Sequence, residues 1–241
     1  MKTFRIGNIP LDNVSLKQAM DTITSYPEDQ PGAVVVTPNA HHCTVAEKDA
    51  EFANICQNAL LTLADGMPLL WISKFHRKPL KEKVSGSDLM PKLTEECAKK
   101  GIPVMIFGGL IGEAEKAAEN LTKQNPGLKV STYYPPFGFD TDPTEDKKAL
   151  DAVRKSAAKV IFVGVGAPKQ EKWAFKHRHE LPGKVLIGIG ASIGFCAGTD
   201  IRAPVWMQKT GLEWTFRLAR EPRRLFARYL ESFKVFLLPC Q

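Results

Sequence analysis

Short apolar segments alternate with amphipathic ones along most of this chain, and this alternation constrains the fold more than any other feature. The apolar segments are rich in β-branched residues or leucine, and they span residues 33–36, 60–63, 103–107, 128–132, 160–164 and 185–189. Such runs are typical of strands buried on both faces of a parallel sheet. Ser15 and Gln18 form a capping-box pattern that predicts a helix to about residue 25, and charged outer faces predict helices over 113–123 and 145–157.

Strands and helices in alternation imply right-handed crossovers and a Rossmann-like, doubly wound α/β fold with a mostly parallel sheet. In such sheets, ligands bind beyond the carboxyl ends of the strands. We therefore look for a site in the turns after the predicted strands, at residues 37–40 (T-P-N-A), 64–66 (A-D-G), 108–112 (G-G-L-I-G), 164–171 (G-V-G-A-P-K-Q-E) and 188–194 (G-I-G-A-S-I-G). Small and polar turns on one edge of a sheet can form the rim of a nucleotide-sized cleft.

The alternation stops near residue 200, so we predict a core over residues 1–200 and a basic helical appendage over residues 201–241. The appendage holds eight basic and three acidic residues, so it contributes +5 to the net charge of +7. A surface this basic favours binding to an acidic partner. On a helical wheel from Pro222, one arc is apolar and the charges lie opposite; the apolar residues are Leu225, Phe226, Tyr229, Leu230, Phe233, Phe236 and Leu237. This pattern is typical of a helix in a membrane interface, or of one packed on the body with a solvated outer face.

Composition narrows the class of protein further. The charge-free stretches, residues 185–198 among them, are too short to span a bilayer, and the first residues lack the apolar run of a signal peptide, so we expect a cytoplasmic protein. Five cysteines without a C-x-x-C pair argue against a disulfide framework and a zinc ribbon, and favour reduced thiols.

Polar residues follow the first two predicted strands. Asp65 comes directly after an apolar run, where a carboxylate can face the cleft as a general base, or can be the N-cap of the next helix. Thr37 and Asn39 flank Pro38, whose ring fixes the backbone and presents both side chains on a short turn. They can hydrogen-bond a sugar or its phosphate, or they can cap the helix that starts near His41.

Two other patterns carry weaker signals. The glycines of residues 108–112 precede a helix and can expose amides to a phosphate, although a tight turn uses glycine as well, and the chain has no dinucleotide fingerprint or P-loop. Asp140 and Asp142 have metal-ligand side chains but lie in a polar stretch typical of a solvated loop, and residues 41–43 (H-H-C) are typical of a helix start. We expect no metal and no other cofactor.

Eight motifs occur in order along nearly the whole chain. They are T-P-N-A, A-D-G, V-S-G-S-D (84–88), G-G-x-x-G, Y-Y-P-P-F-G-F (133–139), G-V-G-A-P-K-Q-E-K-W (164–173), R-A-P (202–204) and G-L-E-W-x-x-R-L-x-x-E-P-x-R (211–224). The last of these and the G-V-G-A-P-K-Q-E-K-W motif are specific. In this combination the chain resembles the WecG/TagA/CpsF family of bacterial glycosyltransferases, glycosyltransferase family 26.

The resemblance implies an inverting transfer of a sugar from a UDP-sugar to an undecaprenyl-diphosphate-linked sugar, in cell-wall or surface polysaccharide assembly. It also implies that the appendage completes the site at the membrane, so we expect a peripheral protein on the anionic inner leaflet of the cytoplasmic membrane. Asp65 matches the general base, Thr37, Asn39 and Gln170 match the polar pocket, and the appendage arginines match Arg217, Arg224 and Arg228. We also expect substrate binding by residues of the matched motifs, namely Gly108, Gly109, Gly138, Gly164, Gly166, Lys169 and Arg202.

Elementary chemistry agrees with these roles. An inverting transfer needs one base for the acceptor hydroxyl and positive groups for the departing diphosphate, and arginines can provide the latter by charge-assisted hydrogen bonds. One position departs from the family pattern, because members usually carry an acid in the segment G-A-x-F-D-F-x-A-G where this chain has Gly194. If that acid holds the donor's ribose, this protein uses another group or binds its donor differently.

Two rival functions remain at this point. A nucleotide-dependent oxidoreductase on the same kind of sheet is disfavoured by the missing dinucleotide fingerprint. A basic nucleic-acid-binding module fits the charge but leaves the strand-end turns without a purpose, so we expect no nucleic-acid partner. The sequence names neither the donor sugar nor the acceptor sugar nor the polymer, and it leaves the oligomeric state open, a homo-oligomer included.

Overall fold

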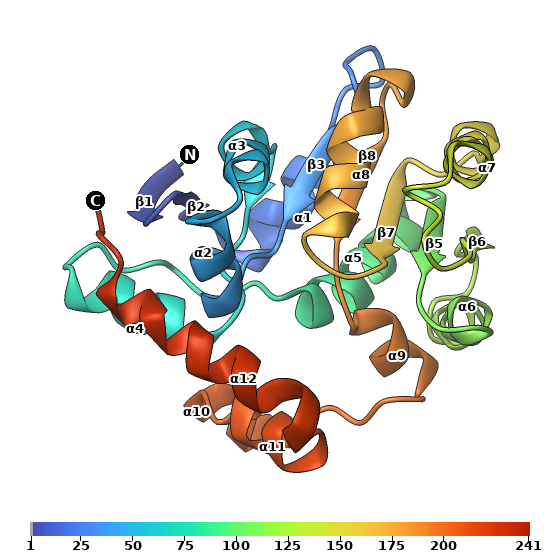
Figure 1. Cartoon of the computed structure of the whole chain (residues 1–241). Helices are drawn as coiled ribbons and strands as arrows, with labels where there is room; N and C mark the ends of the chain where they lie inside the picture. Colours follow the sequence, from blue (N-terminus) through green and yellow to red (C-terminus); the bar gives the residue numbers. More distant parts are fainter. Residues whose placement is uncertain (1) are drawn as a thin grey trace.

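A parallel six-stranded sheet forms the centre of the molecule (Figure 1). The computed structural model describes residues 2–241, apart from the side chains of Lys2, Thr3, Lys209 and Arg224. The sheet has the strand order β4-β3-β8-β7-β5-β6, and every neighbouring pair is parallel. Each predicted apolar run is one of its strands: β3 (Ala33–Val36), β4 (Leu61–Thr62), β5 (Val104–Gly108), β6 (Val130–Tyr133), β7 (Val160–Gly164) and β8 (Val185–Gly188).

Helices cover both faces of this sheet, because alternate residues of each strand point to opposite sides. In β5, Met105 and Phe107 belong to one apolar core, and Val104 and Ile106 to the other. The first core packs against α2 (Ala40–Ala46), α3 (Ala50–Asn58), α4 (Met67–Phe75), α7 (Pro143–Lys155) and α8 (Lys169–His177). The second packs against α1 (Leu16–Thr24), α5 (Gly86–Lys100), α6 (Glu113–Gln124) and α9 (Ser192–Ala197). The predicted doubly wound α/β fold is confirmed.

The helix starts follow from local hydrogen bonding. The Ser15 hydroxyl accepts from the Gln18 backbone N–H at 3.2 Å, and the Gln18 side chain accepts from the Ser15 N–H at 2.9 Å, so the predicted capping box of α1 is confirmed. The Asp142 carboxylate caps α7 by accepting from the N–H groups of Thr144 and Glu145. A short 3₁₀ turn, η1 (Arg178–Glu180), extends α8.

A two-stranded hairpin at the start of the chain was not predicted. Strands β1 (Lys2–Ile6) and β2 (Ile9–Asp12) pair antiparallel and bury Phe4 and Ile6 in the first core. The end of the chain returns to this hairpin, where the Arg5 N–H donates to the Gln241 carbonyl at 2.9 Å. The two termini therefore lie side by side (Figure 1).

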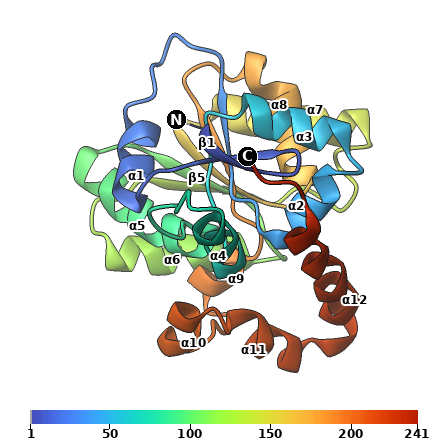
Figure 2. The same cartoon turned by 90° about the vertical axis from the view of Figure 1, so that its left-hand side faces the viewer.

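Three helices and a 3₁₀ turn separate α9 from that return. They are α10 (Val205–Thr210), α11 (Glu213–Arg220), α12 (Pro222–Ser232) and η2 (Phe233–Leu237), and they form a layer to one side of the core (Figure 2). The predicted appendage thus exists as a helical segment, while its boundary at residue 200 stays a prediction. The last helix ends at Ser232 and does not continue through Leu237, because the chain there tightens into the 3₁₀ turn.

The apolar arc of α12 divides between the body and the surface. Leu225 is buried, and the rings of Tyr229 and Phe233 contact the Trp214 indole of α11. Phe226 and Leu230 stay exposed, at 58% and 56% of their surface. Within residues 2–241, no helix is both long enough and apolar enough to cross a bilayer.

Candidate active site

A cavity of about 900 Å³ lies where the carboxyl ends of the strands face α11 and α12. Its volume is that of a typical ligand site. The turns after β3, β4, β5, β7 and β8 form one wall, with Thr37, Asn39, Asp65, Gly109, Gly164, Gly166 and Gln170. The appendage forms the other wall, with Glu213, Trp214, Arg217, Arg220, Arg228 and Tyr229. Residues predicted from distant motifs are therefore brought together here.

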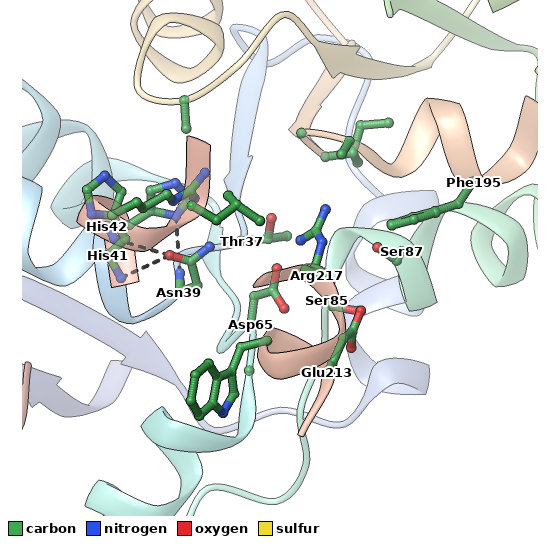
Figure 3. Close-up of a pocket in the computed structure, with 18 of the residues that line it drawn as sticks. Thr37, Asn39, His41, His42, Asp65, Ser85, Ser87, Phe195, Glu213 and Arg217 are labelled. Atoms are coloured by element: carbon green, nitrogen blue, oxygen red, sulfur yellow. Dashed lines mark hydrogen bonds between the residues drawn. The ribbon is translucent and has the colours of Figure 1, made fainter. Parts of the chain in front are cut away.

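Asp65 stands three residues after the end of β4 and lines the cavity (Figure 3). Its backbone N–H donates to the Pro38 carbonyl at 2.9 Å, which joins this turn to the turn after β3. The N-cap of α4 is Gly66, without a side-chain cap, so Asp65 is not used as a helix cap. Within the described part of the chain no hydrogen bond to its carboxylate is present, and the residue lines the cavity.

Burial raises the pKa of Asp65 to about 7. Desolvation is the largest cause, the carboxylates of Glu213 and Asp88 add to it, and the cations of Lys83 and Arg217 oppose it. A carboxyl that changes charge near neutral pH is suited to take a proton from a hydroxyl and to release it afterwards. The side chain thus has the placement and the proton affinity of a general base.

Arg217 and Arg228 reach the same cavity from the appendage. Arg217 points toward Asp65 from α11 (Figure 3), and its guanidinium lies 5.5 Å from the centre of the Phe195 ring. Arg228 comes from α12, and its charge helps burial to lower the pKa of His42 to about 3. His42 is therefore neutral, and the positive charge of this wall is carried by arginine.

Thr37 and Asn39 line the cavity but also hold the turn together. The Thr37 hydroxyl donates to the Gly188 carbonyl at 2.8 Å, which ties the ends of β3 and β8. The Asn39 carbonyl oxygen accepts from the N–H groups of His41 and His42, so this residue is the N-cap of α2. Among the described residues the Asn39 amide nitrogen has no hydrogen-bond partner, and it can donate to a substrate. The capping alternative is thus confirmed, and sugar binding stays a prediction.

Gln170 is nearly fully buried where α8 begins, behind the end of β8. Its amide nitrogen donates to the Glu171 carboxylate at 2.6 Å, and its carbonyl oxygen accepts from the Gly190 N–H at 3.3 Å. Burial raises the pKa of Glu171 to about 7, and its Oε2 has no hydrogen-bond partner in the described structure. Glu171 therefore fixes the orientation of the Gln170 amide, a role that its adjacent position did not reveal in the sequence.

The strand-end glycines allow the backbones to approach one another. A Cβ at Gly108, which has a φ of 103°, would lie 2.7 Å from the Gly164 carbonyl oxygen. Gly108 is thus needed for packing between β5 and β7 and does not itself line the cavity, whereas Gly109, Gly164 and Gly166 do.

Two other predicted binding residues, Gly138 and Lys169, lie outside the lining, and one side chain is not described. Gly138 closes a turn by accepting from the Thr141 N–H at 3.0 Å, and Lys169 pairs with Asp140 at 3.7 Å above the Phe137 ring. The side chain of Arg224 lies outside the described residues. For Gly138 and Lys169 the geometry offers no cavity contact, although substrate binding as such stays a prediction.

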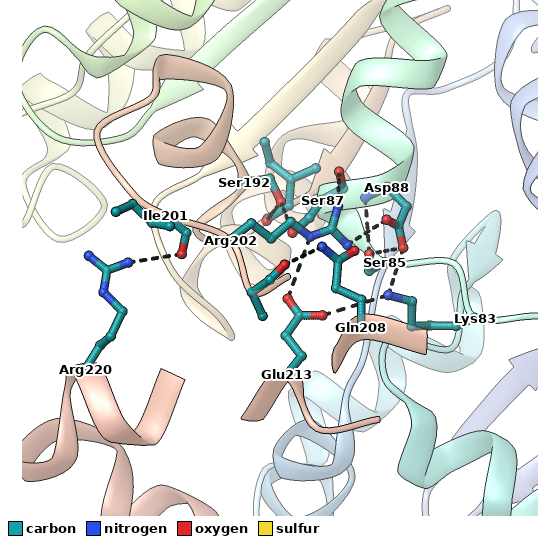
Figure 4. Close-up of polar contacts among 12 residues, drawn as sticks. Lys83, Ser85, Ser87, Asp88, Ser192, Ile201, Arg202, Gln208, Glu213 and Arg220 are labelled. Carbon is teal, nitrogen blue, oxygen red and sulfur yellow. Dashed lines mark hydrogen bonds and ion pairs between the residues drawn. The ribbon is translucent and has the colours of Figure 1, made fainter. Parts of the chain in front are cut away.

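Arg202 joins the core to the appendage (Figure 4). Its guanidinium donates to the Asp88 carboxylate of α5 at 2.6 Å and lies 3.7 Å from the Glu213 carboxylate of α11. Lys83 bridges the same two carboxylates at 2.9 and 3.9 Å. Burial alone would raise the pKa of Asp88, but hydrogen bonds from Ser85, Lys83 and Arg202 hold it below its usual value. The four charges set where α11, and with it Arg217, stands relative to Asp65.

Neither metal pattern of the sequence forms a ligand cluster. Asp142 caps α7 and Asp140 pairs with Lys169, while His41 and His42 start α2 and line the cavity. No group of three or more His, Cys, Asp or Glu side chains that could hold a metal ion occurs in the described part of the chain.

The fold and the cavity are typical of an α/β enzyme, with a carboxylate and arginines lining one cavity beyond the strand ends. In chain order the six sheet strands are arranged 2-1-6-5-3-4, which differs from the 3-2-1-4-5-6 order of dinucleotide-binding enzymes. The family model described as Glycosyl transferase WecG/TagA/CpsF family matches residues 4–240. The chain belongs to this family and is a glycosyltransferase, and neither rival function is supported.

Curated relatives agree along nearly their whole length. A protein of Bacillus subtilis (strain 168) is 29% identical over 225 residues, covering 93% of this chain and 86% of the relative. One of Bacillus spizizenii is 28% identical over 201 residues, covering 83% and 76%, and one of Staphylococcus aureus (strain MRSA252) is 24% identical over 234 residues, covering 96% and 89%. All three are named N-acetylglucosaminyldiphosphoundecaprenol N-acetyl-beta-D-mannosaminyltransferase.

Proposed function

We propose that this enzyme transfers an N-acetylmannosamine-type sugar from a UDP-sugar to an N-acetylglucosamine carried on diphosphoundecaprenol, with inversion at the transferred carbon. The acceptor and the transferred sugar are those in the names of the relatives. The observation that carries the proposal is the single cavity in which Asp65, with its pKa raised to about 7, faces Arg217 of the appendage.

Asp65 acts on the acceptor. Its ionised carboxylate takes the proton of the acceptor hydroxyl while that oxygen attacks the anomeric carbon of the donor. The bond from this carbon to the diphosphate oxygen breaks, and its electron pair leaves with UDP. A single displacement of this kind inverts the configuration. The Asn39 amide, at the turn joined to Asp65 by the Pro38 carbonyl, is placed to donate to one of the sugars.

The arginines act on the leaving group. The UDP diphosphate gains negative charge as the bond breaks, and guanidinium groups stabilise it by charge-assisted hydrogen bonds. Arg217 and Arg228 line the cavity and are available for this role. With these two cations the proposed mechanism needs no metal, so a chelator such as EDTA should leave the transfer rate unchanged.

The exposed part of the appendage serves the lipid end of the acceptor. Leu230 and Leu237 are exposed at 56% and 84%, and the same segment carries the exposed basic residues Arg223 and Lys234. Apolar and cationic groups on one surface favour an anionic membrane interface. Exchange of Leu230 and Leu237 for serine should weaken co-sedimentation with anionic vesicles, whereas Phe137→Ser, which alters a ring exposed at 98% on the core, should not. Equal binding by all three proteins would refute this part.

A donor screen tests the reaction itself. Release of UDP is measured with a prenyl-diphosphate-linked N-acetylglucosamine acceptor and with UDP-glucose, UDP-N-acetylmannosamine or its uronic acid as donor. The proposal predicts acceptor-dependent release with UDP-N-acetylmannosamine and much slower release with the other two. Acceptor-dependent release confined to another donor would overturn the proposed sugar, and no release from any donor would overturn the proposed reaction.

A further inference from the structure

One carboxylate of the cavity, that of Glu113, belongs to a part of the sheet remote from Asp65. Asp65 follows β4 at one edge of the sheet, whereas Glu113 follows β5, and strands β3, β8 and β7 lie between them. Neighbouring strands are ~4.8 Å apart, so the axes of β4 and β5 are separated by roughly 19 Å. Asp65 and Glu113 cannot act on the same atom of a substrate, and a ligand that reaches both must be extended.

Glu113 is held in one orientation by the loop before it. Its Oε2 accepts from the Leu110 N–H at 2.8 Å, and its Oε1 accepts from the Thr199 hydroxyl at 2.6 Å. Each oxygen of a carboxylate can accept two hydrogen bonds, so each retains one free acceptor position. A half-exposed, oriented carboxylate in a cavity wall is prepared to receive two donors from a ligand.

Glu113 also differs from other acidic residues of the cavity in its ion pairs. Asp200 pairs with Arg220 at 3.2 Å, and Glu213 lies within ion-pair distance of Lys83 and Arg202. Among the described side chains, none makes an ion pair with Glu113. The Glu113 carboxylate therefore has no cation paired with it among these side chains, and it can attract hydroxyl or amine donors of a ligand.

Gly194 provides the space that the Glu113 carboxylate uses. A Cβ at Gly194 would lie 3.3 Å from Glu113 Oε1 and 3.4 Å from the Thr199 hydroxyl oxygen. A longer side chain at residue 194 would point into the same recess. The carboxylate of the first residue of α6 thus stands beside a position on α9 that has no side chain of its own.

We propose that Glu113 binds the ribose hydroxyls of the nucleotide donor and so fixes the nucleoside end of the donor subsite. The inference rests on the proposed function: the transferred sugar lies at Asp65, the diphosphate lies toward the arginines, and the nucleoside occupies the remaining end. A ribose has two adjacent hydroxyls that match the two free acceptor positions of a carboxylate. The same pairing of an acidic side chain with a ribose hydroxyl is used in other doubly wound sheets.

Calorimetric titration of UDP, 2′-deoxy-UDP and 3′-deoxy-UDP into wild type and Glu113→Gln tests the inference. The variant should bind UDP about 10- to 100-fold more weakly, because a hydrogen bond to a charged group is lost. The variant should bind UDP and at least one deoxy analogue with about equal affinity, whereas wild type should prefer UDP. A merely structural role of Glu113 would not produce this change. Glu115→Gln, on the exposed first turn of the same helix, is the matched control and should bind as wild type does within about twofold.

A relocated carboxylate gives a second readout. Glu113→Ala should lose UDP affinity, and adding Gly194→Asp should restore it together with the preference for the ribose hydroxyls. No recovery in the double variant would place the ribose contact elsewhere in the cavity. If wild type binds UDP but Glu113→Gln keeps both affinity and preference, the inference alone is overturned. If wild type binds no UDP, the proposed donor fails as well.

Discussion

The core and the appendage meet at the same cavity but bury their apolar side chains to very different degrees. In the sheet, Phe107 and Phe162 are fully buried, whereas Phe226 and Leu237 of the appendage are exposed at 58% and 84%. Dense packing resists displacement, while a segment held by few apolar contacts can shift at little cost. The base of the proposed reaction therefore belongs to the rigid part of the molecule, and the cations that face it belong to the adjustable part.

Within the appendage, the largest loss of activity should appear when a cavity cation is removed. Arg217→Gln is expected to lower kcat about 30- to 1,000-fold, because one stabilising contact to the leaving diphosphate is lost. Arg154→Gln is the control, since Arg154 is exposed on α7 outside the cavity lining. Steady-state transfer rates measure both variants. Equal rates for the two proteins would contradict the assignment of Arg217.

A smaller loss of activity should follow from weakening the ion pairs that connect the core to the appendage. Arg202→Gln removes the 2.6 Å contact with Asp88 and leaves the carboxylates of Asp88 and Glu213 with Lys83 as their cation. Loss of ~1 to 2 kcal/mol of docking energy should reduce kcat/KM about 5- to 30-fold and speed proteolysis after residue 200. If instead only KM rises and proteolysis is unchanged, Arg202 binds substrate directly, as the sequence predicted.

A separate effect concerns the stability of the core alone, and it is expected without a change in the site. Burial raises the pKa of Glu171 from 4.5 to about 7, so the folded state keeps its proton to a higher pH than the unfolded state. Wild type should thus lose stability as pH rises from 4.5 to about 7 and then level off, by on the order of 3 kcal/mol.

Glu171→Gln cannot ionise at this position and should lack this contribution, so wild type should lose more stability than the variant over the same pH range. Urea unfolding of both proteins at about pH 5 and about pH 8 measures the difference. Asp65 titrates in both proteins, so its contribution to the unfolding free energy cancels when the two are compared. A parallel decrease of unfolding free energy in the variant would show that Glu171 does not titrate in this range.

The same contrast explains what the sequence could predict. The strands could be located because buried parallel strands need continuous apolar runs, and the turns after them follow from the fold class. The hairpin of β1 and β2 was not predicted, although the sequence contains a signal for it. Phe4 and Ile6 alternate with polar residues before the Gly7–Asn8 turn, which is a strand pattern followed by a turn.

The partners of the charged residues could not be predicted. The Glu113 carboxylate meets the hydroxyl of Thr199, 86 residues further along the chain, and Arg202 meets Asp88 across 114 residues. Such contacts leave no local pattern, since they arise only when helices from distant segments pack together. Glu113 therefore reads as an ordinary first residue of a helix until the fold is known.

The pH dependence of kcat tests the central claim most directly. Asp65 must be ionised to act as a base, and burial raises its pKa to about 7, so kcat of wild type should rise with pH and level off above about 7. In Asp65→Asn the rate should fall by about 100- to 10,000-fold and lose this dependence. An Asp65→Asn enzyme that keeps the wild-type rate and the same rise with pH would contradict the account.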